Sequence, residues 1–128
     1  MTGHELLLDE DRDYLDSKGL NYEVTPNGGG LLLIVCDFQL PETYNPRAVH
    51  LLVVIPAGYP NACPDMFWTI PDVKLQNGSF PRAADHHEVH GGRNWQRWSR
   101  HFTGGWRVGT DNMRSYFASV RAELRKGI

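Results

Sequence analysis

The 128-residue sequence is poor in cysteine and has no long apolar run. Cys36 and Cys63 are its two cysteines, too few for the disulfide framework of a small secreted domain. The longest apolar run, residues 31–36, is far too short to span a membrane, and the N-terminus shows no apolar signal region. These absences predict a protein of the reducing cytoplasm that has no membrane partner.

The sequence also lacks a large excess of charge of either sign. Its formal net charge of −2 argues against a protein dominated by phosphate binding, so no nucleic-acid partner is expected. The acids nevertheless crowd residues 9–16, and arginines cluster in residues 93–107. This uneven distribution of charge along the chain indicates either a charged partner surface or a solvated helix face. The length and the 41% hydrophobic content predict one globular domain, residues 1–128.

The pattern of apolar residues predicts an α+β domain with a helix near each end of the chain. Residues 9–18 form the first expected helix, which ends at Gly19. The second helix is expected to follow Thr110 as its N-cap, with Asp111 at its positive end and Gly127 at its stop. Its apolar face repeats at three- and four-residue steps. That face consists of Met113, Tyr116, Phe117, Val120 and Leu124.

Four apolar segments between these helices predict a four-stranded antiparallel meander. The segments are residues 21–25, 31–38, 49–55 and 66–70, and residues 26–30 supply a hairpin turn between the first two. Residues 72–109 show little periodicity and are rich in Gly, His, Arg and Trp. Such a stretch is long for a mere connection, and we predict that it is the loop that carries the functional site.

Prolines and an aromatic residue stand at fixed intervals after the third predicted strand. Pro56, Tyr59, Pro60 and Pro64 predict a rigid turn, because each proline fixes φ and removes a backbone donor. This spacing resembles the Pro-x-x-Tyr-Pro-x-x-x-Pro turn of the ubiquitin-conjugating enzyme (UBC) superfamily. More narrowly, the segment WQRWSRH at residues 95–101, followed by Trp106 and an Asp-initiated helix, resembles the bacterial group called prokaryotic family E.

The resemblance covers essentially the whole chain and implies a UBC-like fold. That fold comprises an N-terminal helix, a four-stranded antiparallel meander, a long active-site loop and a C-terminal helix. The resemblance also implies a bacterial ubiquitin-like modification pathway. The implied partners are a ubiquitin-like protein, its activating enzyme and a peptidase of the same pathway, and no cofactor is implied.

Relatives in this superfamily carry the C-terminal acyl group of the ubiquitin-like protein on a cysteine that lies beyond the fourth strand. Here no cysteine follows Cys63, which lies before that strand, and there is no His-Pro-Asn tripeptide. In the eukaryotic relatives a Trp follows the cysteine by roughly eight positions. Ser99 precedes Trp106 by seven positions and is therefore the best occupant of the nucleophile position. Its acyl product would be an oxyester.

A hydroxyl nucleophile needs a base and oxyanion assistance. Since residues two apart share a face of an extended chain, His101 is the expected base for Ser99. The competing or auxiliary groups of the same loop are His86, His87, His90 and Asn94, with Asn94 and Arg100 as oxyanion donors.

The alternative hypothesis is a catalytically inactive UBC-like adaptor that binds a ubiquitin-like protein or an activating enzyme. Trp and Arg are the usual anchors of protein interfaces. We expect Trp95 and Trp106 to be structural and the two arginines of residues 97–100 to be more exposed. The residues predicted to bind a partner are Tyr59, Arg97, Trp98 and Arg100.

The segment DHHEVH at residues 85–90 resembles a zinc site at first sight, because His86 and His90 have the four-residue spacing of one helix face. The run HEVH at residues 87–90 is one residue short of the zinc protease motif, and Gly91 and Gly92 would end any helix at once. We therefore expect no bound metal.

Overall fold

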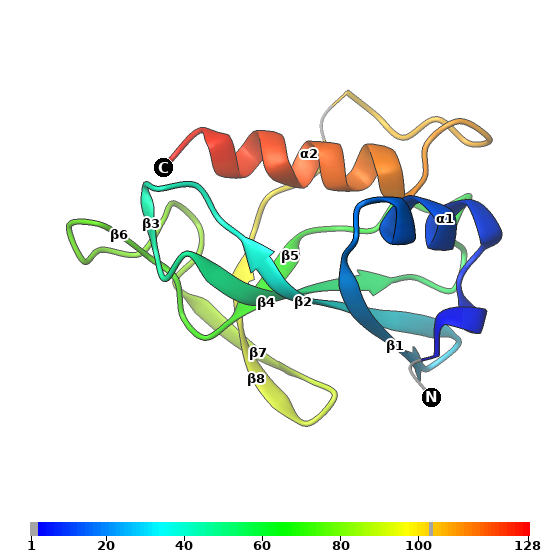
Figure 1. Ribbon diagram of the computed structural model, residues 1–128, viewed down its shortest axis with the longest axis horizontal. Helices are drawn as coiled ribbons and strands as arrows, with labels where there is room; N and C mark the ends of the chain where they lie inside the picture. Colours follow the sequence, from blue (N-terminus) through cyan, green and yellow to red (C-terminus); the bar gives the residue numbers. More distant parts are fainter. Residues whose placement is uncertain (1–2, 103) are drawn as a thin grey trace.

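The computed structural model of the protein describes residues 3–102 and 104–128. Two helices lie on one side of a twisted antiparallel sheet (Figure 1). A 3-10 helix, η1 (His4–Leu6), precedes α1 (Asp9–Ser17), and α2 (Met113–Arg125) lies near the end of the chain. The predicted α+β class with two helices is confirmed. No helix in these two described ranges has the length and apolar character needed to cross a membrane.

The main sheet has six strands in the spatial order β1-β2-β4-β5-β8-β7, and each neighbouring pair is antiparallel. Two short strands, β3 and β6, pair with each other in a second sheet. The strands are β1 (Asn21–Asn27), β2 (Gly30–Gln39), β3 (Tyr44–Asn45), β4 (Ala48–Ile55), β5 (Phe67–Ile70), β6 (Lys74–Leu75), β7 (His86–His90) and β8 (Arg93–Trp98).

The predicted meander corresponds to β1, β2, β4 and β5, but the count of four strands is wrong. The hairpin β7–β8 lies within residues 72–109, which the sequence predicted as one long loop. Its strands show no apolar alternation, because consecutive side chains of β8 are buried on both faces of the sheet. Trp95 and Gln96 are both fully buried, so a polar residue occupies a core position where the period-two pattern requires an apolar one.

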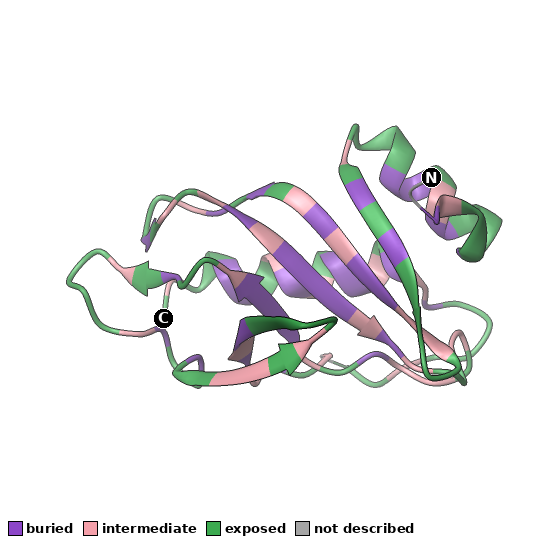
Figure 2. Ribbon diagram, turned by 90° about the horizontal axis from the view of Figure 1, so that it is seen from below, coloured by how far each residue is buried: buried purple, intermediate pink, exposed green. Residues whose placement is uncertain are grey.

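The main core lies between the sheet and the helices. Leu33, Leu51 and Phe67 from the sheet pack in one cluster with Phe117 of α2. The opposite face of the sheet carries a second cluster, formed by Leu32, Leu52, Trp68 and Trp95. The central strands β2 and β4 are therefore largely buried along their length, whereas the outer surface of α1 is exposed (Figure 2).

The hairpin β7–β8 contributes to the second cluster and extends below the sheet, away from α2 (Figure 1). A Cβ at Gly91, in its turn, would come within 3.2 Å of Leu32 in β2. The turn of the hairpin thus approaches the far face of the sheet closely, and Gly91 has a φ of +59° that favours glycine.

The start of α2 differs from the prediction. Asn112 is the N-cap, its side chain accepts the Ser115 amide at 3.3 Å, and the Ser115 hydroxyl in turn accepts the Asn112 amide at 2.9 Å. The predicted N-cap, Thr110, lies outside the helix. Asp111 instead accepts the main-chain amide of Arg107 at 2.7 Å, which stabilises the preceding turn and delays the helix start.

Candidate functional site

The candidate site lies where β8 ends and the chain leaves the sheet. Ser99 is the first residue after β8, and its amide donates to the carbonyl of Ala83 at 2.9 Å. Its hydroxyl oxygen accepts a hydrogen bond from Nε of Arg97 at 3.1 Å, and the residue is half-buried. The segment at residues 83–84, which we call the wall of the site, therefore lies beside the main chain of Ser99. Arg97 orients the hydroxyl by donating to its oxygen.

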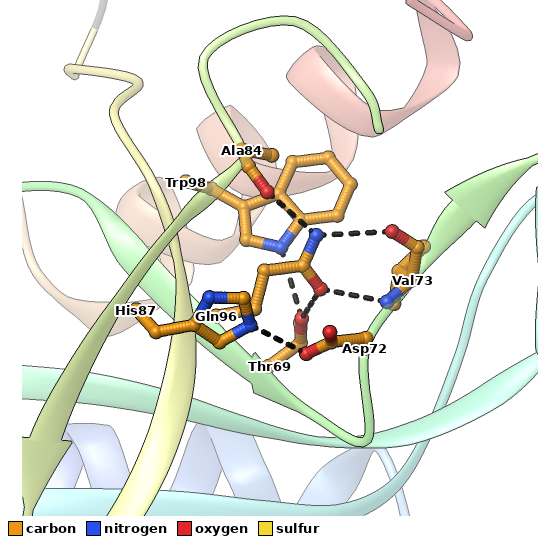
Figure 3. Close-up of polar contacts among 7 residues, drawn as sticks. All are labelled: Thr69, Asp72, Val73, Ala84, His87, Gln96 and Trp98. Carbon is orange, nitrogen blue, oxygen red and sulfur yellow. Dashed lines mark hydrogen bonds and ion pairs between the residues drawn. The ribbon is translucent and has the colours of Figure 1, made fainter. Parts of the chain in front are cut away.

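The wall is held in place by the buried side chain of Gln96 (Figure 3). Its Nε2 donates to the carbonyls of Val73 at 3.0 Å and Ala84 at 2.8 Å. Its Oε1 accepts the Val73 amide at 2.6 Å and the Thr69 hydroxyl at 3.1 Å. Every polar group of this buried amide is satisfied, so Gln96 ties residues 73 and 84 to β8. Sequence reasoning missed this role, because a glutamine in an Arg- and Trp-rich segment gives no signal of burial.

Arg97 is itself oriented by Glu88 of β7. Nη1 of Arg97 donates to Oε2 of Glu88 at 2.7 Å, and Nε1 of Trp68 donates to Oε1 at 3.0 Å. Burial acts to raise the pKa of the Glu88 carboxyl, but hydrogen bonds from Trp68, Arg97 and His90 outweigh it and lower the pKa below its usual value. Glu88 is thus a charged anchor that connects the hairpin to the Ser99 hydroxyl through one guanidinium.

His101, the predicted base, pairs with Asp65 of the proline turn. Nδ1 of the imidazole lies 2.5 Å from Oδ1 of Asp65. Because a carboxylate only accepts hydrogen bonds, Nδ1 carries the proton in this contact, and in the neutral imidazole Nε2 is then the acceptor. The His101 side chain is 68% exposed. In the described ranges no hydrogen bond joins His101 to Ser99, so the structure does not bring the two together directly.

The auxiliary residues lie along the β7–β8 hairpin. His87 pairs with Asp72 at 2.8 Å (Figure 3), and His90 contacts Glu88 at 3.4 Å. His86 stands opposite Arg97 in the ladder, and Asn94 is exposed near the turn of the hairpin. Considering residues 3–102 and 104–128, none of these four forms a hydrogen bond with Ser99. Nor do three His, Cys, Asp or Glu side chains converge there as metal ligands would.

Two residues predicted to bind a partner are buried, which removes them from the partner-binding surface. Trp98 has no exposed surface, stacks on Phe67 at 5.2 Å between ring centroids and donates to the Thr69 hydroxyl at 2.9 Å. Arg100 is only 4% exposed, because its guanidinium lies 5.0 Å above the Trp98 ring. Burial, followed by the charge of Arg82, lowers the pKa of Arg100.

Arg100 has a structural contact that the sequence did not indicate. Its Nη2 donates to the carbonyl oxygens of Arg82 at 2.7 Å and Ile128 at 2.5 Å. The guanidinium therefore ties the segment before β7 to the segment after α2, and it is unsuited to the oxyanion role that an exposed side chain could fill. The expectation that Arg97 and Arg100 are both exposed is wrong for Arg100 and only partly met for Arg97, which is half-buried.

The proline turn is attached to α1 and to the segment that precedes α2. The Tyr59 hydroxyl donates to Asp11 of α1 at 2.7 Å, and Nε1 of Trp106 donates to the Pro60 carbonyl at 2.8 Å. Burial and then the hydrogen bond to Asp11 raise the pKa of Tyr59. The residue is half-buried. Tyr59 is therefore engaged inside the protein, and the buried Trp95 and half-buried Trp106 are structural as expected.

Neither cysteine is prepared for nucleophilic chemistry. Cys63 is half-buried in the proline turn, and burial, followed by the charges of Asp65 and Asp111, raises the pKa of its thiol to about 11. Burial also raises the pKa of Cys36 in β2. Since the thiolate is the nucleophile, both groups are less reactive than an exposed thiol.

The sequence model of prokaryotic E2 family E matches residues 7–127, which is nearly the whole chain. No curated protein and no solved structure matches the chain significantly.

Proposed function

Because the chain belongs to prokaryotic E2 family E, we propose that it accepts the C-terminal acyl group of a ubiquitin-like protein from an activating enzyme and holds it as an oxyester on Ser99. The family makes it an E2-like protein of a prokaryotic ubiquitin-like pathway. A ubiquitin-like protein and its activating enzyme are the partners of such proteins in general, and a peptidase of the same pathway is a third proposed partner.

The serine hypothesis is supported by two orienting contacts, one on the Ser99 hydroxyl and one on His101, two residues later in the sequence. Arg97, held by Glu88, donates to the hydroxyl oxygen and leaves the hydroxyl proton free to be given away. Two residues later, Asp65 orients the imidazole of His101 so that Nε2 faces away from the carboxylate as an acceptor. A nucleophile, an oriented base and the group that orients the base are the parts that activated hydroxyls use elsewhere.

The proposed reaction is an exchange of one acyl bond for another. Oγ of Ser99 attacks the thioester carbonyl on the activating enzyme, and the hydroxyl proton passes to Nε2 of His101. The C–S bond then breaks, and the departing thiolate takes the proton from His101. The exposed His101 side chain has to rotate toward Ser99 for this transfer. Charge that develops near Oγ is stabilised by the guanidinium of Arg97.

A second candidate function is supported by the resting contacts of Ser99. Its hydroxyl is occupied by Arg97, and His101 is paired elsewhere. An adaptor without chemistry, which binds a ubiquitin-like protein or an activating enzyme, would need neither residue to move. The half-buried Arg97 and the exposed Asn94 and His101 are surface groups that such an adaptor could use.

The test is reconstitution with the cognate activating enzyme, ATP and the ubiquitin-like protein. We expect a covalent adduct that survives reductant and is cleaved by hydroxylamine or mild base. Ser99→Ala should abolish it, whereas Ser79→Ala, at an exposed serine, should not. Ser99→Cys should give a reductant-sensitive adduct at the same position. If Ser99→Ala leaves conjugation intact, the serine hypothesis is wrong and the adaptor function remains.

A further inference from the structure

One face of α2 presents three arginines that the proposed acyl transfer does not use. Arg114, Arg121 and Arg125 share this face because they are seven and four residues apart. Lys18 stands beside them, directly after α1. Together with Tyr14 and Ala118 these cations line an open hollow, which we call the basic groove. Both helices that form it lie on the same side of the sheet (Figure 1).

Two of the guanidinium groups are fixed by Tyr14, a buried residue of α1. The guanidinium carbon of Arg114 lies 5.0 Å from the centroid of the Tyr14 ring. Nη1 of Arg121 donates to the Tyr14 hydroxyl at 2.9 Å, and its guanidinium also lies 5.2 Å above the Phe38 ring. Cations held in this way lose less conformational entropy when they bind an anion than free side chains do.

Among the described residues, the four cations of the basic groove have no carboxylate partner. Directly after the same helix Lys126 pairs with Glu123 at 2.6 Å, and in α1 Arg12 pairs with Asp9 at 2.5 Å. Within residues 3–102 and 104–128, no acidic side chain forms an ion pair with any cation of the groove. Several unpaired like charges around one hollow repel each other, and a bound anion relieves that repulsion.

A second open hollow adjoins the basic groove. It shares Arg121 and Arg125 with the groove, and its remaining lining is mainly apolar. That apolar lining consists of Phe38, Leu40, Pro41 and Leu124. The surface therefore offers a space for an apolar side chain directly beside a row of cations.

We infer that the basic groove and the adjoining hollow bind a short acidic peptide segment of a partner protein, with one apolar side chain seated in the hollow. Arginine forks match carboxylates, and Arg114 and Arg125 are about 16 Å apart along the helix axis at 1.5 Å per residue. A segment of about five extended residues spans that distance. This site goes beyond acyl transfer and does not depend on Ser99.

The chemistry favours a peptide over a nucleic acid for two reasons. The adjoining apolar hollow suits an aliphatic or aromatic side chain, which a phosphate backbone does not supply. The groove is also bordered by α1, whose exposed carboxylates would repel a long polyanion that ran past its end. Those carboxylates are Asp9, Glu10, Asp13 and Asp16.

The probe is a fluorescein-labelled peptide of about ten residues with four glutamates and one central leucine, so that the five residues that span the groove have flanking residues on both sides. Its binding to the full chain is measured by fluorescence anisotropy, and the contacted amides are located by NMR. We expect binding that weakens with added salt and amide shifts centred on residues 114–125. The double variant Arg114→Gln/Arg125→Gln should weaken binding about tenfold, since each exposed ion pair contributes modestly. Both side chains are exposed, so folding should be retained.

Three controls make the outcome decisive. Arg93→Gln removes an exposed cation from the β7–β8 hairpin and should leave binding unchanged. A peptide with Gln in place of Glu should not bind, and one with Ala in place of Leu should bind more weakly. Equal loss with Arg93→Gln, binding of the neutral peptide, or tighter binding of a single-stranded oligonucleotide of similar charge would each overturn the inference. None of these outcomes bears on the Ser99 adduct, which is measured separately.

Discussion

The carboxylate of Asp11 in α1 accepts the main-chain amide of Met113, the first residue of α2, at 3.1 Å across 102 residues of sequence. Asn112 caps the helix locally, and Asp11 satisfies a further amide that the helix itself leaves unpaired. The same carboxylate accepts the Tyr59 hydroxyl at 2.7 Å. One buried acid therefore joins α1, the proline turn and the start of α2, which are the three elements that frame one end of the sheet.

Replacement of this acid should destabilise the fold. Asp11→Ala leaves the Met113 amide and the Tyr59 hydroxyl without their partner, and we expect a loss of about 2 kcal/mol in the free energy of unfolding. The measurement is urea unfolding followed by circular dichroism. Asp13→Ala, at an exposed position of the same helix, is the control and should change stability by less than about 0.5 kcal/mol. Equal effects of the two variants would contradict the role assigned to Asp11.

The pH dependence of stability should carry a signature of Asp11. Burial raises the pKa of its carboxyl in the folded protein above the ordinary value of 3.8, despite the opposing hydrogen bonds from Tyr59 and Met113. The folded state then binds more protons than the unfolded state between the two pKa values. The contribution of Asp11 is therefore complete below its unfolded pKa and is lost as the pH rises through its folded pKa.

Comparison of the wild type with Asp11→Asn isolates this effect from the other acids. The hydrogen bond from the Arg107 amide lowers the pKa of Asp111, for example. The contribution of Asp111 to stability is therefore lost as the pH falls, whereas that of Asp11 is lost as the pH rises. We expect the difference in unfolding free energy between wild type and Asp11→Asn to shrink from about pH 3 to about pH 7. A difference that grows over this range would show that the hydrogen bonds outweigh the cost of burial.

The prediction of the fold from the sequence succeeded in the segments whose apolar residues repeat with the period of a helix or follow a strand pattern. The two helices and strands β1, β2, β4 and β5 have apolar patterns of their own, and the turn residues Gly28 and Gly29 adopt the positive φ values that a tight hairpin needs. The hairpin β7–β8 was missed because its buried residues are held by side-chain partners. Gln96 is satisfied by main-chain groups of residues 73 and 84, which are far away in sequence.

Gln96 should be among the least replaceable polar residues of the chain. Gln96→Leu is similar in size but leaves the amide and carbonyl of Val73 and the carbonyl of Ala84 unsatisfied in a buried site (Figure 3). We expect a loss of about 3 kcal/mol in the free energy of unfolding. Gln39→Leu, the same substitution at an exposed position of β2, should be nearly neutral. Thermal unfolding of both variants measures the contrast, and a mild effect at Gln96 would mean that water replaces its contacts.

The Cys63 thiol should resist alkylation in the folded protein. Its pKa of about 11, against an ordinary value of 9.0, lowers the thiolate fraction near neutral pH by about 100-fold. Iodoacetamide labelling followed by mass spectrometry should therefore be about 100-fold slower at Cys63 in the native protein than in urea. Rapid native labelling would show that the proline turn opens and would make Cys63 a candidate nucleophile.

Much of the candidate site was also unpredictable from the sequence, for a geometrical reason. Sequence spacing suggested that Ser99 and His101 share a face, but the strand ends at Trp98, and the alternation does not continue to His101. Asp65 was missed as the partner of His101 because the two lie 36 residues apart. The alternation does hold between Arg97 and Ser99, whose side chains are in hydrogen-bond contact.

This contact makes Glu88 a positioning residue for the proposed acyl transfer. Glu88→Gln removes the anion that fixes Arg97, so the guanidinium should no longer hold the Ser99 hydroxyl in one orientation. We expect the rate of adduct formation at saturating activating enzyme to fall about tenfold, which corresponds to about 1.4 kcal/mol in the barrier. The concentration of activating enzyme that gives half the maximal rate should stay unchanged, because Glu88 acts on orientation and not on docking.

Two further variants decide whether the effect is one of orientation. Glu88→Asp keeps the charge and should restore part of the rate, and Asp72→Asn breaks the His87 pair on the same hairpin and should leave the rate unchanged. Single-turnover kinetics of the ester adduct provide the measurement. If Glu88→Gln and Asp72→Asn slow the reaction equally, the hairpin acts only through its general stability. If neither does, Arg97 is positioned without Glu88, and Glu88 has no role in the transfer.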